Sequence, residues 1–368
     1  MPIAGDVNVR CFHHARAGEL DNDSCKEPLQ HHGFDKAALA LTLDDIAISY
    51  HRPGLMDRLR GAPAPVPTVD GITMRIARGE TIGLVGESGS GKSTILKCIA
   101  GLLPPRDGAV TMGQGQPLTP AVERREKEQL RCVQMIFQNP DESLNPRQTV
   151  AEILAQPLRL YFGLSGRALL ERATELLDMV RLGAHYLDRL PGQLSGGEKQ
   201  RVAVARAFAA DPEVVLCDEI TSALDVSVQA AVLELLDELK RSRDTTYLFV
   251  SHDLAVVQAL SDRVAVLYQG RLCEFGPVER VYGQPSHPYT TVLLGAVLEP
   301  DPDTAPTLMA EDAVELSPPG QGCPFQRRCP RKLGAQCETD TPPWQETAEG
   351  HVIRCHIPID ELAKTDPD

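Results

Sequence analysis

A glycine-rich run that directly follows an apolar stretch constrains this chain more than any other feature. The run extends from Gly86 to Ser93 and reads GESGSGKS, which is the phosphate-binding P-loop pattern. We expect a strand over 81–85 before it and a helix over 94–100 after it. In that setting backbone N–H groups and a helix N-terminus surround a polyphosphate, Lys92 reaches the β- and γ-phosphates, and Ser93 binds Mg²⁺. The pattern predicts an α/β fold with a nucleotide site.

A pair of acidic residues supports this site from a distant part of the sequence. Residues 214–217 read VVLC, which is typical of a buried parallel strand, and Asp218 and Glu219 follow directly. Asp218 can hold the Mg²⁺ shell, and Glu219 can orient or deprotonate an attacking water. Two carboxylates after a strand are by themselves more often part of a solvated loop. Together with a P-loop they favour a catalytic role.

Composition excludes several other classes of protein. The 368 residues are 42% hydrophobic, and 37 basic against 51 acidic side chains give a net charge of −14. This balance argues against a general nucleic-acid binder, which needs a basic surface. The sequence contains no run of 18 apolar residues and no recognisable secretory signal. Ten cysteines are too dilute for a disulfide scaffold, but four of them gather near the C-terminus.

Changes in composition and in hydrophobic periodicity divide the chain into three parts. Residues 1–36 show no periodicity and are expected to form a disordered leader. Residues 37–285 alternate expected strands and helices, and residues 286–368 form a proline- and cysteine-rich domain. A faint similarity between residues 9–13 and 353–356 leaves a further interpretation open, in which the leader is the remnant of a preceding tandem half.

The segment 194–200, which reads LSGGEKQ, resembles the signature motif of ABC-type ATPases. Other segments then resemble the motifs of that family in order. The resemblance implies a RecA-like core with an antiparallel β subdomain and a helical subdomain, and ATP and Mg²⁺ as ligands. It implies catalytic roles for Lys92, Glu219 and His252, the switch histidine. It implies Mg²⁺ binding by Ser93, Gln138 of the Q-loop and Asp218. The implied nucleotide-binding positions are Tyr50, which would stack on adenine, Gly86, Ser88, Gly89, Gly91, Lys92, Ser93, Thr94, Gln138, Ser195, Gly196, Gly197, Asp218 and Asp225 of the D-loop.

The signature segment has a physical interpretation of its own. Ser195, Gly196 and Gly197 precede an expected helix over 198–209, which makes a second helix N-terminus able to bind an anion. The resemblance implies a head-to-tail pair, in which the signature of one ATPase domain closes the P-loop of another. Because Glu219 and His252 match the family pattern, we expect a site competent for hydrolysis.

The C-terminal part resembles a particular branch of the family. The segments 287–290 (HPYT) and 322–330 (GCPFQRRCP) are similar to the C-terminal region of oligopeptide, dipeptide and nickel importer ATPases. The resemblance implies an ATPase that powers peptide import from the cytoplasmic face of the inner membrane. It implies two membrane permeases, a second ATPase domain (a paralogue or a fused half) and an extracytoplasmic solute-binding protein as partners, and no nucleic acid. Nickel or another solute, and a non-transport accessory ATPase, are the alternatives.

Cys323, Cys329, Cys337 and Cys355 favour a metal site over two disulfides in a cytosolic chain. Four thiolates suit a [4Fe–4S] cluster or tetrahedral Zn²⁺, although the spacing matches neither the usual ferredoxin nor the zinc-ribbon pattern. The family resemblance implies the iron–sulfur cluster, with zinc and unliganded thiols as alternatives. Its expected role is to stabilise a small proline-rich segment rather than to catalyse redox chemistry.

Overall fold

The computed structural model describes residues 39–50, 67–222, 224–295, 322–347 and 350–364. Its centre is an eight-stranded sheet in the order β10-β11-β9-β8-β3-β7-β6-β5. The strands β5, β6, β7, β3 and β8 run parallel, and β9, β11 and β10 extend the sheet with antiparallel pairs. The strands are β3 Thr81–Val85, β5 Val133–Ile136, β6 Val214–Asp218, β7 Thr246–Val250, β8 Arg263–Tyr268, β9 Arg271–Pro277, β10 Trp344–Glu346 and β11 Val352–Arg354.

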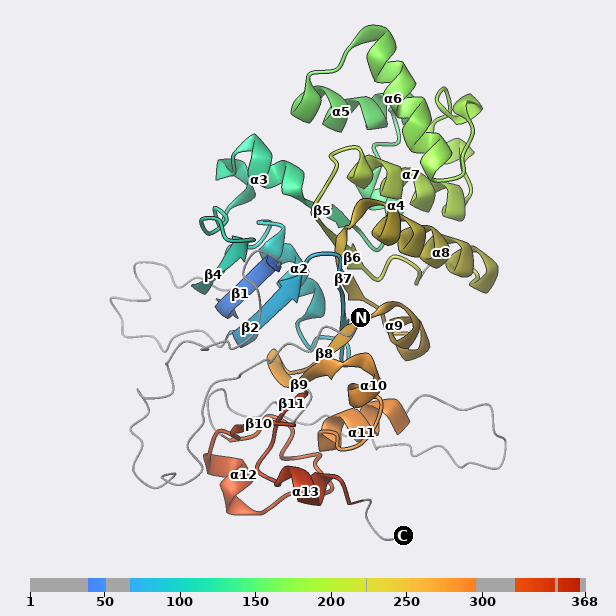
Figure 1. Ribbon diagram of the computed structural model, residues 1–368. Helices are drawn as coiled ribbons and strands as arrows, with labels where there is room; N and C mark the ends of the chain where they lie inside the picture. The colour runs from blue at the N-terminus through green and yellow to red at the C-terminus, as the bar shows by residue number, and fades with distance from the viewer. Residues whose placement is uncertain (1–38, 51–66, 223, 296–321, 348–349, 365–368) are drawn as a thin grey trace.

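A second, antiparallel sheet packs beside the first one (Figure 1). It has the order β2-β1-β4, with β1 Leu39–Ile48, β2 Val69–Ala77 and β4 Asp107–Met112. Apolar side chains of this sheet, of helix α2 (Lys92–Ile99) and of one face of the large sheet form a common core. This core fixes the P-loop, which connects β3 to α2, between the two sheets.

Helices cover the other face of the large sheet and extend into a separate lobe (Figure 1). Their apolar faces form a second core with side chains from the large sheet, to which the C-terminal region also contributes Cys323 and Phe325. None of the helices in the described residues has the length and apolar character of a membrane span. The helices are α3 Lys127–Cys132, α4 Pro140–Ser143, α5 Val150–Phe162, α6 Gly166–Met179, α7 Gly196–Phe208, α8 Val226–Arg243, α9 Leu254–Leu260 and α10 Val278–Val281.

The C-terminal region returns to the large sheet. After α11 (Pro288–Gly295), α12 (Ala335–Thr339) and β10, strand β11 pairs with β9, with Val352 opposite Phe275, and α13 (Ile359–Leu362) follows. Buried Glu274 of β9 accepts hydrogen bonds from His287 N–H at 2.8 Å and from Thr290, and lies 2.6 Å from His351 Nε2. The boundary proposed at residue 285 falls between α10 and α11, and the two sides of it share one sheet.

Most expected elements are confirmed within a few residues. The strand over 81–85 is β3, and the strand expected over 214–217 is β6, which also includes Asp218. The helices expected from 94 and 198 each begin two residues earlier, at Lys92 and Gly196, because a glycine or a capping serine comes directly before. The leader over residues 1–36 and its proposed tandem origin lie outside the described residues.

Candidate nucleotide site

The P-loop lies at the carboxyl edge of the parallel strands and is organised around Lys92. Its buried ammonium donates to the carbonyl oxygens of Gly86 at 2.6 Å and Glu87 at 2.9 Å. Burial lowers the pKa of Lys92, while the carboxylates of Glu219, Asp218 and Glu87 act in the opposite direction. The lysine is therefore fixed against its own loop. Three carboxylates lie near it, and a bound cation would reduce the repulsion among them.

Two glycines of the loop are required by its geometry. Gly86 has a φ of 145°, and a Cβ there would lie 2.1 Å from the carbonyl oxygen of Leu267 in β8. Gly91 has a φ of 101° and precedes α2 without any side-chain cap. Because the first N–H groups of a helix lack intrahelical partners, this uncapped terminus is able to bind an anion. Ser88 and Gly89 are exposed at the tip of the loop.

The two acidic residues after the VVLC segment lie beside the P-loop. The Ser93 hydroxyl donates to Asp218 Oδ1 at 2.7 Å, across 125 positions of sequence. Glu219 follows with a φ of 47°, and its N–H donates to Val250 at the end of β7. Gln138 Nε2 donates to Glu219 Oε2 at 2.9 Å. The structure thus gathers the hydroxyl, carboxylate and amide groups that suit a Mg²⁺ ion and a positioned water.

The other residues expected at the nucleotide site, Tyr50, His252 and Asp225, make fewer contacts than those beside the P-loop. Tyr50 is 58% exposed, and its hydroxyl lies 3.1 Å from Thr94 Oγ1 at the start of α2. His252 is exposed after β7 and makes no hydrogen bond to any other described residue. Asp225 caps α8 by accepting from Val228 N–H at 3.0 Å, and its hydrogen bond from Ser227 is the main cause that lowers its pKa. No contact in the described residues shows what Tyr50 or His252 would bind.

The signature segment forms the N-terminus of α7 and caps this helix with its own side chains. Ser195 Oγ accepts from Glu198 N–H, and Glu198 Oε2 accepts from Ser195 N–H at 2.7 Å, which is a capping box. The Tyr186 hydroxyl also donates to Glu198. Gly197 packs against α8, where a Cβ would lie 2.4 Å from Val228 Cγ1. In the described residues no hydrogen bond joins Ser195, Gly196 or Gly197 to the P-loop of the same chain.

Family models and related proteins agree with this arrangement. The model described as "ABC transporter" matches residues 69–222, and the model described as "Oligopeptide/dipeptide transporter, C-terminal region" matches residues 273–337. Oligopeptide transport ATP-binding protein OppF of Salmonella typhimurium is 42% identical over 306 residues, which cover 82% of this chain and 90% of that protein. A Brucella ovis ATP-binding protein named for peptide import is 41% identical over 305 residues, 82% of this chain and 95% of that protein.

The chain belongs to the ATP-binding proteins of the ABC transporter family. This ABC ATPase shares its fold with solved structures. CbiO1 of Clostridium perfringens aligns with a TM-score of 0.56 at 24% identity, over 67% of this chain and 91% of the other. A dimeric ATP-binding cassette with ADP and phosphate bound aligns with a TM-score of 0.54 at 28% identity, over 65% of this chain and 98% of the other.

The four C-terminal cysteines of this ABC ATPase lie in one small region but do not form a single-ion site. Cys323, Cys329 and Cys337 all act electrostatically on Cys355, and burial raises the pKa of Cys355 to about 12 and of Cys323 to about 11. A zinc site would place all four sulfurs about 2.3 Å from one ion. The described residues contain no group of three or more His, Cys, Asp or Glu side chains that could hold a metal ion.

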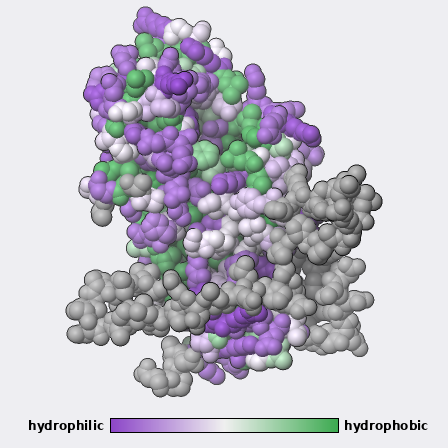
Figure 2. All heavy atoms as spheres, turned by 180° about the vertical axis from the view of Figure 1, so that it is seen from behind, coloured by the Kyte–Doolittle hydropathy of each residue, from purple (hydrophilic) through white to green (hydrophobic). Residues whose placement is uncertain are grey.

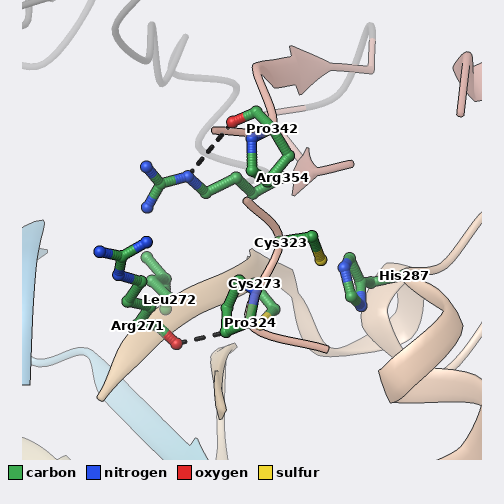
Figure 3. Close-up of a pocket in the computed structure, with 8 residues that line it drawn as sticks. All are labelled: Arg271, Leu272, Cys273, His287, Cys323, Pro324, Pro342 and Arg354. Carbon is green, nitrogen blue, oxygen red and sulfur yellow. Dashed lines mark hydrogen bonds between the residues drawn. The ribbon is translucent and has the colours of Figure 1, made fainter. Parts of the chain in front are cut away.

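A fifth cysteine lies beside this region. Cys273 of β9 and Cys323 line one small cavity together with His287 and Arg354 (Figure 3). Burial lowers the pKa of His287 to about 4, and burial also raises the pKa of Cys273. Figure 3 shows the sulfur of Cys323 directed toward His287. On this side of the C-terminal region, uncharged cysteine and histidine side chains therefore pack against β9 beside the side chain of Arg354.

Sequence reasoning missed several residues at the edge of the site. Ser222 lies 3.4 Å from Gln138 Nε2, and Tyr289 and Arg328 both bind Glu87 of the P-loop. Ser222 was within the D-loop segment and could have been suspected. Tyr289 and Arg328 gave no signal, because their partner is more than 200 positions away in the sequence.

Proposed function

We propose that this chain is the ATP-hydrolysing subunit of an importer for oligopeptides or dipeptides. The observation that carries the proposal is the convergence of Ser93, Asp218, Glu219 and Gln138 beside the P-loop. The matching C-terminal family model and the relatives named for peptide transport support the choice of substrate class.

In this proposal each group at the edge has a separate task. The N–H groups of the loop and of α2 bind the phosphates of ATP, and Lys92 adds its charge to the β- and γ-phosphates. Ser93, Asp218 and Gln138 would hold Mg²⁺, which neutralises charge on the transferred group. Glu219 orients the attacking water and accepts its proton, and His252 contacts the γ-phosphate. Tyr50 stacks on the adenine.

A second ATPase domain completes the site. The N-terminus of α7 faces outward with exposed Ser195 and Gly196, so it binds the nucleotide of a partner domain in a head-to-tail pair. Asp225 and its D-loop border the same face. ATP binding closes the pair, and hydrolysis opens it.

The helical lobe is the proposed contact with two membrane permeases. Leu160, Phe162, Leu170 and Leu190 in this lobe are each at least 38% exposed. Figure 2 shows apolar surface interspersed among polar side chains at this end of the molecule. Exposed large apolar side chains are typical of protein interaction surfaces. The chain would lie on the cytoplasmic face of the inner membrane, and a solute-binding protein would deliver the peptide to the permeases.

The cysteine region is the proposed site of a [4Fe–4S] cluster. The four thiols are close enough to influence one another, and a four-iron cluster separates its ligands more widely than one ion does. The cluster would supply cross-links between segments that have little core of their own. Iron and acid-labile sulfide should be present in anaerobically purified protein and absent after Cys329→Ser, which should also make residues 322–347 more sensitive to protease.

One purification tests the importer proposal. The native protein should be captured from solubilised membranes under anaerobic conditions, and every chain that accompanies it identified by mass spectrometry. Two permeases and a second ATPase, together with ATP-dependent peptide uptake in vesicles, are the expected result. Recovery without permeases, or uptake of metal ions instead of peptides, would contradict the proposal.

A further inference from the structure

One peptide unit of the P-loop is held from two sides. The carbonyl of Gly86 accepts a hydrogen bond from Lys92 Nζ at 2.6 Å, and the N–H of Glu87 donates to the Tyr289 hydroxyl oxygen at 2.8 Å. These two groups belong to the same planar peptide unit, so fixing the direction of one fixes the other. Tyr289 of α11 therefore determines where Lys92 finds its anchoring carbonyl.

The side chain of the same glutamate has a second partner from the C-terminal region. Arg328 Nη1 lies 2.8 Å from Glu87 Oε2. The arginine guanidinium also lies 5.9 Å from the ring centre of Tyr268 and 6.0 Å from that of Phe325. Glu87 is thus held at both its backbone and its carboxylate by residues that lie outside the ATPase motifs.

Both partners are anchored in one aromatic cluster. The ring centres of Tyr268 and Tyr289 are 4.6 Å apart, and Phe325 lies 5.2 Å and 5.3 Å from them. Tyr289 and Phe325 are completely buried. Phe325 and Arg328 belong to the short segment between Cys323 and Cys329. The packing therefore connects the cysteine-bearing segment, the end of β8 and the P-loop through direct contacts.

We propose that Tyr289 and Arg328 are positioning residues of the P-loop, and that through them nucleotide binding is coupled to the order of residues 322–347. The inference rests on the proposed nucleotide-binding role of the P-loop. Coupling between two sites is reciprocal. Bound nucleotide should therefore order the cysteine-bearing segment, and loosening of that segment should weaken nucleotide binding by the same factor.

The two residues act by different physical means. Tyr289 supplies an acceptor to a backbone N–H that would otherwise be left without its partner. Arg328 neutralises a carboxylate that lies close enough to influence Lys92 and hence the bound phosphates. Removing the arginine leaves a negative charge beside an anionic ligand, and removing the carboxylate as well eliminates that repulsion.

The first test separates affinity from turnover in the purified full-length chain. ATP dissociation constants and kcat would be compared for wild type, Tyr289→Phe, Arg328→Gln, Glu87→Gln and the Glu87→Gln/Arg328→Gln pair. We expect roughly 5- to 30-fold weaker ATP binding for Tyr289→Phe and about 2- to 5-fold for Arg328→Gln. The double variant should bind ATP as Glu87→Gln does. The kcat at saturating ATP, measured in the assembled transporter, should stay within about twofold for Tyr289→Phe and Arg328→Gln.

Lys332→Gln is the matched control, because it removes one positive charge from the same segment, where Lys332 pairs with Glu338 at 2.5 Å. It should leave ATP affinity unchanged. Hydrogen exchange of residues 322–347 supplies the reciprocal measurement: ATP should slow it in the wild type but not in Tyr289→Phe or Arg328→Gln. If Tyr289→Phe does not fold, the Arg328 and Glu87 variants carry the test.

Unchanged dissociation constants, an equal loss in Lys332→Gln, or a fall in kcat without a change in affinity would overturn the inference. Exchange rates that do not respond to ATP in the wild type would also overturn it. A wild-type chain that fails to bind ATP would instead contradict the proposed function.

Discussion

The N-termini of α2 and α7, which carry the P-loop and the signature segment, are built differently. Helix α2 begins at Lys92 after left-handed Gly91 and has no side-chain cap. Helix α7 begins at Gly196 after Ser195, which forms a reciprocal capping box with Glu198. The first helix leaves its terminal N–H groups available to a phosphate, whereas the second satisfies part of its own.

The glycines of the two termini also differ in what they require. A Cβ at Gly86 would lie 2.1 Å from a backbone oxygen, whereas at Gly196 the nearest atom, Leu224 Cδ2, is at an ordinary 3.7 Å. The P-loop glycines are therefore needed by the chain's own structure. The chain's own structure does not require a glycine at position 196. A requirement for glycine there would come from a group that approaches the exposed terminus. This comparison teaches that the first site is formed within one chain, while the second terminus has space for a group from outside the chain, as the proposed head-to-tail pair requires.

Glu219→Gln should have the largest effect, because it stops turnover while leaving both termini intact. The loss of a general base reduces the rate by about 10²- to 10⁴-fold, and ATP affinity should be retained. The α7 terminus should then remain engaged, so a closed pair should accumulate with ATP and be visible by size-exclusion chromatography. Glu234→Gln on the exposed face of α8 is the control. Wild-type turnover in Glu219→Gln would remove this residue from its role.

Gly86→Ala should have the second-largest effect, and it should reduce both the stability of the fold and the affinity for ATP. The added methyl group meets the carbonyl of Leu267, which belongs to β8 and cannot rotate away. Overpacking of this kind costs about 1–3 kcal/mol of stability. Thermal unfolding without nucleotide and ATP titration would measure the two effects. A variant that keeps both stability and ATP affinity would show that the P-loop is not constrained as described.

Gly196→Ala should separate the two termini most sharply. The added Cβ has space, and alanine favours a helix over glycine by up to about 1 kcal/mol, so stability should not fall. ATP affinity of the single chain should also be unchanged. Turnover of the assembled transporter should fall about tenfold, because the methyl group would obstruct the approach of a phosphate to the exposed N–H groups.

Gly192→Ala, where a Cβ would meet nothing within 4 Å, is the control for this experiment. It should change neither stability nor turnover. Full turnover in Gly196→Ala would indicate that no ligand approaches the terminus of α7, and it would remove the distinction between the two sites.

The same distinction explains what the sequence could and could not predict. The P-loop, the acidic pair at the end of β6 and the α7 terminus are encoded in short continuous segments, with strand, turn and cap signals that act within a few residues. Their bounds were therefore predicted closely. The sequence assigned both Ser93 and Asp218 to Mg²⁺ binding, and the structure adds that the two side chains are hydrogen-bonded to each other.

Contacts that join distant segments could not be predicted. Nothing near Glu274 indicates that it is completely buried and lies 2.6 Å from His351 Nε2. Likewise, the pairing of β11 with β9 and the contacts of Tyr289 and Arg328 with Glu87 depend on how the C-terminal region returns to the sheet. These are tertiary contacts between residues whose local surroundings carry no signal for them.

Ser195→Ala should have the smallest effect and tests whether α7 is complete by itself. Loss of a capping serine typically costs about 1 kcal/mol. Because Glu198 keeps its hydrogen bond from Tyr186, the helix should still begin at the same place, and the unfolding midpoint in urea should shift slightly. Ser242→Ala is a suitable comparison, since its exposed hydroxyl donates to the Leu239 carbonyl and caps no helix N-terminus. ATP affinity of the single Ser195→Ala chain should match wild type, since α2 and its loop are untouched. A loss of affinity in the isolated chain would mean that the two termini meet within one molecule, which contradicts the separation on which the comparison depends.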